Sequence, residues 1–334
     1  MSSASNADKG VIRIGTRGSK LAVAQSGMVA REVEAILGVP CELVTIKTDG
    51  DVLTGSLANL GGTGVFVAAL RQAVLDGRVD IAVHSLKDMP TADAPGLVIA
   101  ATPKRADPRD ALCARDGLTL AELPTDASVG TGSPRRVSQL KAFRKDLETH
   151  DIRGNVDTRL AKVRASSTAQ ASHENGGEGT GVLDAVVLAC AGLDRVGLAE
   201  AITERIDPAV MLPAPGQGAL ALETRADSEL ARALAAYDDA PTRLAVTAER
   251  ALLAALEAGC AAPVGALGTF ADGQLHLEAV AGTLDGTTML RHAMSQAVSS
   301  REQARALGYE LAEFLLEAGA DQLPGVRTSS DSGD

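Results

Sequence analysis

Short apolar runs alternate with segments of helical periodicity over the first two thirds of the chain. The run Ile81–Val83 has the length of a buried strand, whereas Val67, Leu70 and Val74 share one face of a predicted helix. Alternation of this kind is typical of α/β domains with doubly wound sheets. The expected strands cover 11–14, 43–46, 81–83, 98–101, 128–130, 151–153, 184–189 and 219–223, and the clearest helices cover 66–75 and 134–143.

The last third of the chain has a different pattern, in which two helices flank three strand-like segments. Asp272-Gly273 is a strong hairpin signal between the first two of these segments, and Asp285-Gly286 separates the second from the third. This order predicts a small α+β domain. Its helices are expected over 242–257 and 300–318, and its strands over 264–270, 274–281 and 287–294.

Two Pro- and Asp-containing stretches, 103–109 and 239–242, mark domain boundaries. The apolar run 219–223 is expected to return to the first sheet. The Ser/Gly/Ala/Glu-rich segment 163–181 is expected to be a flexible surface insertion. We therefore expect domain 1 over 10–103 and 217–238, domain 2 over 104–216, and domain 3 over 239–324, with disordered tails at 1–9 and 325–334.

The composition narrows the class of protein. With 334 residues, 45% hydrophobic and 22% charged, the chain is typical of a soluble protein with two or three domains. The net charge of −11 and the absence of Trp disfavour nucleic acid as a partner. No apolar run reaches the ~18 residues of a membrane span, and Met1–Gly10 lacks the apolar core of a secretory signal. We therefore expect a cytoplasmic protein without a membrane partner.

The stretch Asp80–Pro90 carries the most concentrated chemistry. His84, Ser85, Lys87 and Asp88 follow a buried strand within five positions. In an open α/β sheet, ligands bind outside the carboxyl ends of the strands, which favours a ligand site. A solvated turn with a surface ion pair would have the same sequence pattern, and such a pair would contribute little to stability. The stretch alone leaves both interpretations open.

Cationic side chains recur at four more corners where a strand ends. Two doubly wound domains that face each other would bring these corners to one cleft. An Arg guanidinium binds carboxylate or phosphate in a fork, so the cleft suits a small polyanion. No P-loop or G-x-G-x-x-G follows a strand, which disfavours a nucleotide. The corner residues are Arg17, Lys87 with Asp88, Arg135 with Arg136, Arg153 with Arg159, and Arg195.

The four cysteines differ in their surroundings. They are far apart and have no C-x-x-C spacing, which argues against a metal site and against a disulfide framework. Cys41, Cys113 and Cys190 lie beside apolar stretches and read as inert buried thiols. Cys260 instead lies among small residues, after a Gly, on a predicted loop that could reach into the cleft and react.

Taken together, six motifs resemble those of the porphobilinogen deaminase (hydroxymethylbilane synthase) family, in the same order, over about residues 11–322. The motifs are Ile14–Ser19, Asp80–Asp88, Gly130–Arg136, Arg153–Asn155, Leu212–Ala219 and Gly259-Cys260.

The resemblance implies a fold of two domains like type II periplasmic binding proteins and a third, small α+β domain. It implies a dipyrromethane cofactor joined to Cys260 by a thioether. It also implies a transferase of tetrapyrrole and heme biosynthesis that joins four porphobilinogen molecules head to tail, with loss of ammonia, and releases hydroxymethylbilane. A monomer would be sufficient for this activity.

The resemblance also implies residue roles. Asp88 would be the catalytic carboxylate. The loop 47–63 resembles the family's mobile loop, but Asn59 and Thr63 stand where some members carry lysines, so a role for loop cations is in question. The cofactor would contact Ser85, Lys87, Asp88, Thr131, Ser133, Arg135 and Arg136, and the substrate Arg17, Ser19, Gln25, Arg153, Arg159, Arg195 and Gln217.

Two other classes of protein remain as alternatives. A non-catalytic solute-binding protein would share the two-domain cleft, but it would carry a secretory signal and would not need Cys260. A regulatory protein that has lost the chemistry would lack Asp88 or Cys260, and both are present.

Overall fold

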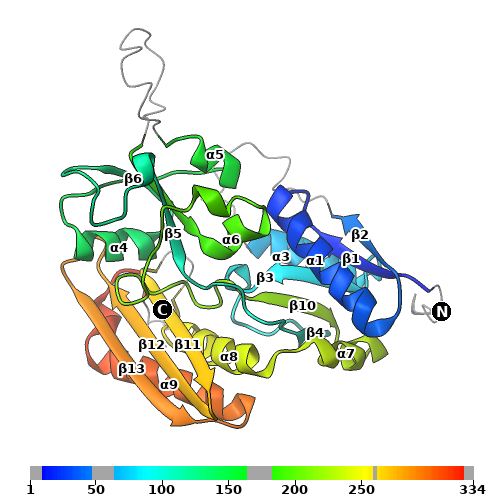
Figure 1. Cartoon of the computed structure of the whole chain (residues 1–334). Coiled ribbons are helices and arrows are strands. Elements are labelled where there is room, and N and C mark those ends of the chain that lie inside the picture. The colour runs from blue at the N-terminus through cyan, green and yellow to red at the C-terminus, as the bar shows by residue number, and fades with distance from the viewer. Residues whose placement is uncertain (1–9, 47–63, 164–182, 259–261, 327–334) are drawn as a thin grey trace, which may run out of the picture.

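The computed structural model describes residues 10–46, 64–163, 183–258 and 262–326. Figure 1 shows three lobes, two of them built on mixed sheets with helices and the third on a smaller sheet. In the first sheet, β1 pairs in parallel with β2 and β3, and β10 is antiparallel to both of its neighbours. Its strand order is β2 (Cys41–Thr45), β1 (Ile12–Thr16), β3 (Ile81–Ser85), β10 (Leu220–Arg225) and β4 (Leu97–Ala101).

The second sheet repeats this arrangement. Its central strand β6 pairs in parallel with β7 and β8, and β5 lies antiparallel between β8 and β9. Each sheet thus contains one antiparallel strand, β10 or β5, that follows a segment of the chain crossing between the two lobes. The order is β7 (Glu148–His150), β6 (Ser128–Gly130), β8 (Ala185–Ala189), β5 (Asp110–Ala114) and β9 (Glu204–Arg205).

The helices of these two lobes begin and end at local signals. The first helix, α1 (Lys20–Leu37), begins after Ser19, whose Oγ accepts a hydrogen bond from the backbone N of Ala22, and ends at Gly38 with φ 67°. Pro134 occupies the first turn of α4 (Pro134–Phe143), where no backbone donor is needed. The other helices are α3 (Gly64–Leu75), α5 (Val156–Leu160), α6 (Cys190–Arg195) and α7 (Glu229–Ala233), with 3-10 turns at Leu86–Asp88, Arg115–Gly117, Ala199–Ala201 and Leu234–Tyr237.

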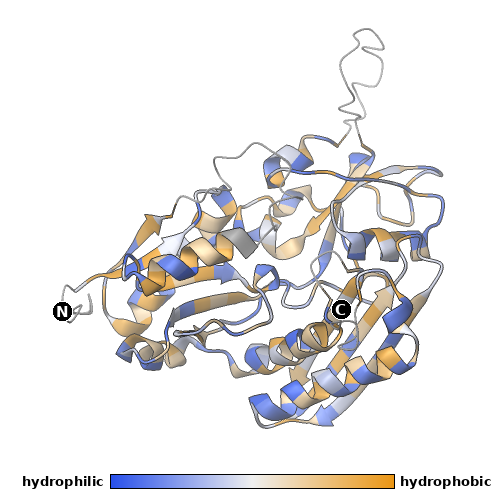
Figure 2. Cartoon of the chain, turned by 180° about the vertical axis from the view of Figure 1, so that it is seen from behind, coloured by the Kyte–Doolittle hydropathy of each residue, from blue (hydrophilic) through white to orange (hydrophobic). Residues whose placement is uncertain are grey.

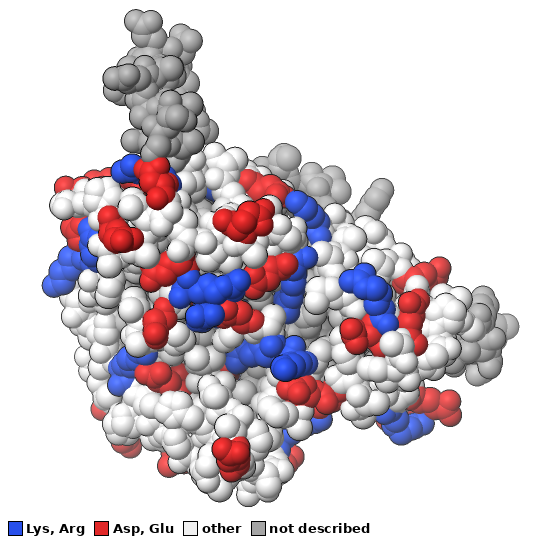
Figure 3. Space-filling view, in the orientation of Figure 1, with Lys and Arg blue, Asp and Glu red and all other residues white. Residues whose placement is uncertain are grey.

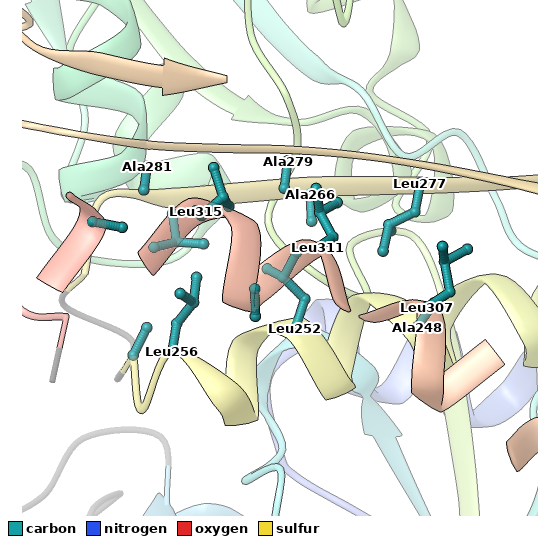
Figure 4. Packing of buried hydrophobic residues seen from close by; sticks show 14 of the residues in the cluster. Ala248, Leu252, Leu256, Ala266, Leu277, Ala279, Ala281, Leu307, Leu311 and Leu315 are labelled. Atoms are coloured by element: carbon teal, nitrogen blue, oxygen red, sulfur yellow. The ribbon is translucent and has the colours of Figure 1, made fainter. Parts of the chain in front are cut away.

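The third lobe packs two helices on one face of an antiparallel sheet. Leu252, Leu311 and Leu315 point at the sheet in Figure 4, and all three are fully buried. A Cβ on Gly308 would lie 2.3 Å from the Ala248 carbonyl oxygen, so this glycine allows the helices to touch. The elements are α8 (Ala240–Ala255), β11 (Val264–Ala271), β12 (Gln274–Gly282), β13 (Met289–Ala297) and α9 (Arg301–Glu317), followed by a 3-10 turn at Ala320–Gln322.

A buried carboxylate fixes this lobe to the other two. Glu249 of α8 is 0% exposed, and it accepts hydrogen bonds from the backbone N of Gly216 and of Gly268. Its carboxylate also pairs with Arg105. Since Gly216 lies in the segment that crosses between the two large lobes, this one side chain holds all three parts together.

The architecture confirms the expected fold class of two doubly wound α/β domains and a small α+β domain. The predicted hairpin at Asp272-Gly273 is confirmed, with both residues at positive φ, as is the return of the strand at 219–223 to the first sheet. Figure 2 shows the helices with hydrophilic residues along one side and hydrophobic residues along the other. The boundaries given for the three domains stay a prediction.

Three details of the predicted elements were wrong. The strand expected at 151–153 ends earlier, at His150. The second strand starts at Cys41 and ends at Thr45, rather than covering 43–46. No strand was expected at 110–114, where the chain forms β5, the crossing strand that pairs with β8.

Candidate active site

A small pocket lies at the carboxyl ends of β1 and β3, where an α/β sheet is expected to bind its ligand. Its volume is about 100 Å³. His84 and Phe66 are among the residues that line the pocket. The pocket brings together five of the residues predicted from the sequence: Arg17, Ser19, Gln25, Ser85 and Asp88.

The segment after β3 places Asp88 in this pocket. Leu86 is 1% exposed, and its backbone N donates to the Ala219 carbonyl oxygen at 3.0 Å. This anchor turns the chain through one 3-10 turn, which leaves Lys87 and Asp88 half-buried. Among the described residues, Asp88 has no ion-pair partner. Its carboxylate therefore remains available to a ligand.

Two contacts fix the side chains opposite Asp88. The guanidinium carbon of Arg17 lies 3.5 Å from the centre of the Phe66 ring, a cation–π contact that holds the charge beside the pocket. The side-chain amide of Gln25 lies 3.3 Å from Oγ of Ser85. The pocket therefore offers both a cation and hydrogen-bonding groups next to the carboxylate.

A second cluster surrounds the buried carboxylate of Asp110. Arg135 donates from Nη1 to Oδ2 of Asp110 at 2.7 Å, and Arg136 donates from Nη2 to Oδ1 at 2.7 Å. Gln217 adds a hydrogen bond from Nε2 to Oδ1 at 2.9 Å. All four side chains are buried. The two arginines thus converge as predicted, but they share a carboxylate that sequence reasoning did not assign to the site.

The electrostatics of this cluster favour an added anion. Burial by itself would raise the pKa of Asp110, but the charges of Arg135 and Arg136 hold it below its usual range. Burial lowers the pKa of Lys87 to about 8. Lys87 donates from Nζ to Oε1 of Gln217 at 3.2 Å. Three cations thus face Asp110 and the neighbouring Asp88, which leaves an excess of positive charge.

Unused donors in the cluster also favour an anionic ligand. Nε of Arg135 is buried and has no hydrogen-bond partner among the described residues. A buried donor without a partner costs about 1–3 kcal/mol, which a ligand acceptor would recover. The cluster is therefore suited to a carboxylate-bearing cofactor.

The remaining arginines line the second lobe. Arg195 lies at the end of α6, not in a turn, and its Nη2 donates to the Gly218 carbonyl oxygen at 2.7 Å. Burial lowers its pKa to about 10. Arg159 is half-buried, and burial, followed by repulsion from Arg136, lowers its pKa. Arg153 is exposed and pairs with Asp151 at 3.1 Å. Arg159 therefore lies within electrostatic reach of the Asp110 cluster, while Arg153 lies at the surface.

Thr131 and Ser133 lie between β6 and α4. Thr131 is buried, and its Oγ1 accepts a hydrogen bond from the backbone N of Ser133 at 3.3 Å. Ser133 is the N-cap residue of α4, yet its hydroxyl makes no capping bond. This hydroxyl is one residue away from the arginine-bearing turn of α4. Cys260, the loop 47–63 with Asn59 and Thr63, and 164–181 of the insertion lie outside the described residues.

Sequence reasoning missed Asp110 and one further buried charge network. His84 Nε2 lies 3.2 Å from Glu223, which also pairs with Arg71 at 3.0 Å. Burial would raise the pKa of Glu223, but the neighbouring His84 and Arg71 lower it. Asp110 and Glu223 each stand at one end of an apolar strand-like run, and that position was the available signal. Among the described residues, no group of His, Cys, Asp and Glu is arranged to hold a metal ion.

Comparisons with known proteins cover nearly the whole chain. The model "Porphobilinogen deaminase, dipyromethane cofactor binding domain" matches residues 12–233, and "Porphobilinogen deaminase, C-terminal domain" matches 243–317. Among solved structures, an ABC transporter periplasmic substrate-binding protein from Coxiella burnetii is similar at 12% identity and a TM-score of 0.39, over 71% of this chain and 94% of that chain.

Curated relatives carry the same name as the family model. The porphobilinogen deaminase of Micrococcus luteus is 53% identical over 97% of both chains. Porphobilinogen deaminase 1 of Streptomyces coelicolor is 54% identical over 95% of this chain and 98% of its own length. The chain therefore belongs to the porphobilinogen deaminase family, transferases of tetrapyrrole biosynthesis that use a dipyrromethane cofactor.

Proposed function

We propose that this protein joins four porphobilinogen molecules head to tail, with loss of ammonia, on a dipyrromethane cofactor attached to Cys260, and releases hydroxymethylbilane. The observation that carries the proposal is the position of Asp88. Its carboxylate lines a pocket with Arg17 and is next in sequence to Lys87, which Gln217 joins to the buried carboxylate of Asp110. A carboxylate next to several cations suits a substrate that carries acid groups and reacts through a cationic ring.

The Asp110 cluster fits the cofactor. Each pyrrole of dipyrromethane carries an acetate and a propionate, so the group is strongly anionic. The excess cations of Lys87, Arg135 and Arg136, and the unpartnered Nε of Arg135, suit such acid groups. When bound, the cofactor supplies the pyrrole to which the next ring is added. Ser133, Thr131 and Ser85 would add neutral hydrogen-bonding groups around it.

The neighbourhood of Cys260 supports its role as the attachment point. Cys260 stands between Ala258 and Ala262, which both belong to the buried core of the third lobe. Shortly after it, the backbone N of Ala266 donates to the Pro213 carbonyl oxygen at 2.9 Å. Arg135 donates to the adjacent Leu212 carbonyl oxygen at 2.6 Å. The start of β11 therefore lies close to the cations proposed to bind the cofactor.

Asp88 would carry the proton-transfer chemistry. Loss of ammonia and ring coupling place positive charge on pyrrole rings, and a carboxylate that accepts pyrrole N–H hydrogen bonds stabilises that charge. The same carboxylate can accept a proton and return it. Because Asp88 forms no ion pair among the described residues, its carboxylate oxygens remain available to accept these hydrogen bonds.

The other arginines would capture the acid groups of porphobilinogen and of the growing chain. Arg17, Ser19 and Gln25 line the pocket of Asp88. Arg159 and Arg195 are partly buried, so each carries a charge that water screens only in part. The exposed pair of Arg153 with Asp151 costs little to break, so Arg153 can exchange this carboxylate for one on the substrate.

We further propose a monomer in the cytoplasm, without nucleic acid or membrane as a partner. Every residue assigned a role belongs to one chain. The net charge of −11 opposes binding to nucleic acid. The described cysteines, Cys41, Cys113 and Cys190, are free thiols, which is typical of a reducing compartment. In the described ranges, no helix is both long and apolar enough to cross a bilayer. Solute binding without catalysis is not favoured.

The intact mass of the purified full-length protein tests this proposal, together with Cys260→Ala and, as a control, Cys41→Ala. We expect wild type and Cys41→Ala to exceed the polypeptide mass by two deaminated porphobilinogen units, and Cys260→Ala to show no excess. A bare polypeptide that gains no covalent mass after incubation with porphobilinogen would overturn the proposal in favour of a binding protein.

A further inference from the structure

The larger of the two described pockets lies away from the active site. It has a volume of about 670 Å³ and is walled by the first sheet on one side and by α8 and α9 on the other. Leu86 lines it, and Arg250 donates hydrogen bonds to the Met89 and Pro90 carbonyl oxygens. The pocket therefore lies behind the segment that carries Asp88, and its volume is in the range of small-molecule sites.

Arginines dominate the charge of this pocket. Arg71 pairs with Glu223, and Arg243 and Arg301 both pair with Asp238. Two carboxylates, Glu223 and Asp93, line the pocket, while Asp238 and Glu302 act on its arginines from outside the lining. The five arginines still exceed these four carboxylates by one, in a protein of net charge −11. Figure 3 shows one face of the molecule, on which Lys and Arg side chains also lie around the central hollow. The five arginines are Arg71, Arg243, Arg250, Arg301 and Arg305.

Two of these arginines are not held by an ion pair. Within the described ranges, neither Arg250 nor Arg305 forms an ion pair. Arg250 is held in place by the two backbone carbonyls, whereas Arg305 is exposed on α9. A half-buried and an exposed guanidinium at one pocket can together bind an acid group that enters it.

Thr102 adds a neutral group to the wall. It is 0% exposed, and its Oγ1 has no hydrogen-bond partner among the residues that the structure describes. Its backbone N is already bound to Asp238, so the hydroxyl is the unused group. A buried hydroxyl without a partner is costly, and an acceptor on a ligand would satisfy it. Thr102 lines the same pocket as the arginines.

We infer that this pocket binds a small organic anion with two or more acid groups, carboxylate or phosphate. Arg250 and Arg305, which form no ion pair within the described ranges, would bind the acid groups, and Thr102 would donate a hydrogen bond. The site is separate from the cleft of Asp88, and it does not share a lining residue with that pocket. Citrate and pyrophosphate are suitable probes, since one carries carboxylates and the other phosphates.

Calorimetric titration of the purified full-length protein tests the inference. We expect citrate, pyrophosphate or both to bind wild type, and Arg305→Met to weaken this binding at least tenfold. Arg305 is exposed and unpaired among described residues, so the variant should fold normally. Arg250→Met should have at least as large an effect, provided that its melting temperature shows it to be folded. The probe that binds more tightly identifies the acid group.

Arg31→Met is the matched control, because Arg31 is an exposed helical arginine on α1 that does not line the pocket. This variant should bind citrate and pyrophosphate with the same affinity as wild type. Equal affinity in wild type and Arg305→Met would place any binding elsewhere and overturn the inference. The absence of binding to wild type by both probes at concentrations near 10 mM would overturn it as well, since two guanidinium groups that form no ion pair should bind more tightly than that.

Discussion

Nζ of Lys87 lies 3.2 Å from Oε1 of Gln217, although the two residues are 130 positions apart. The same Gln217 donates to Oδ1 of Asp110 at 2.9 Å. One amide side chain therefore joins the end of β3 in the first lobe to the buried carboxylate of the second. Because Gln217 lies in the crossing segment, the distance between Lys87 and the arginine pair depends on how the two lobes sit against each other.

Asp110→Asn should lower the free energy of unfolding by about 3–5 kcal/mol, because two buried arginines would lose their shared counter-charge. Urea unfolding measures this directly. The control is Asp157→Asn, which removes a carboxylate from an exposed pair with Lys20 and should cost less than about 1 kcal/mol. Similar losses for the two variants would show that the Asp110 carboxylate is not needed to hold Arg135 and Arg136.

Lys87 should make stability and activity respond to pH in opposite directions. Burial lowers its pKa from 10.5 to about 8. Between those values the unfolded chain binds more protons at this group than the folded chain does, so its contribution to the free energy of unfolding rises with pH. Over the same window the folded protein loses the Lys87 cation, so binding of acid groups should weaken above about pH 8.

A comparison of wild type with Lys87→Met separates the effect of the Lys87 charge from the titration of other groups. We expect the difference in unfolding free energy between wild type and Lys87→Met to shift in favour of wild type from pH 7.5 to pH 9.5. Lys104→Met, which removes an exposed lysine, should show no such shift. A wild-type KM for porphobilinogen that stays constant across pH 8 would show that the Lys87 charge does not contribute to binding.

Local signals predicted many elements correctly. The expected helix over 134–143 forms α4 with Pro134 in its first turn, and Asp272-Gly273 makes the expected hairpin between β11 and β12. Each of these signals acts within a few residues. The rule that ligands bind at the carboxyl ends of strands was sufficient to predict a shared site for Arg17, Ser85 and Asp88, without any knowledge of the tertiary structure.

The choice of charge partners could not be predicted in this way. Arg135 and Arg136 bind Asp110, which is about 25 positions earlier in the chain, and Glu223 binds Arg71 across 152 positions. Such pairs form only after the sheets are assembled. The strand β5 was missed for the same reason, since its partners β8 and β9 follow it by many residues.

Arg153→His should weaken substrate capture with little effect on stability. The Arg153 side chain is 72% exposed, and its pair with Asp151 is also exposed, so the substitution should cost less than about 1 kcal/mol of unfolding free energy. KM for porphobilinogen should rise severalfold, more at low salt, because one cation is lost from the path of an anion.

Arg78→His is a closely matched control for Arg153→His. Arg78 is also exposed and pairs with an aspartate two positions earlier, Asp76, but it lies outside both pockets. It should leave KM unchanged. A fall in the melting temperature of Arg153→His with unchanged kinetics would contradict the proposed role of Arg153.

Asp88→Asn should lower kcat at least a hundredfold while the fold and the covalent cofactor remain in place. An amide can still hydrogen-bond a pyrrole, but it cannot carry the negative charge or accept a proton, so general acid–base catalysis is lost. The carboxylate is half-buried and unpaired among the described residues, so the melting temperature should change by only a few degrees.

Asp93→Asn removes the same charge from an exposed position five residues further along the chain and should keep wild-type kcat. Intact mass of both variants shows whether the cofactor is present, which separates a defect in turnover from a defect in cofactor assembly. Near-normal turnover by Asp88→Asn would exclude Asp88 as the proton-transfer group. The reacting rings would then have to exchange protons with another group lining the pocket, for which His84, held by Glu223, is the nearest titratable candidate in sequence.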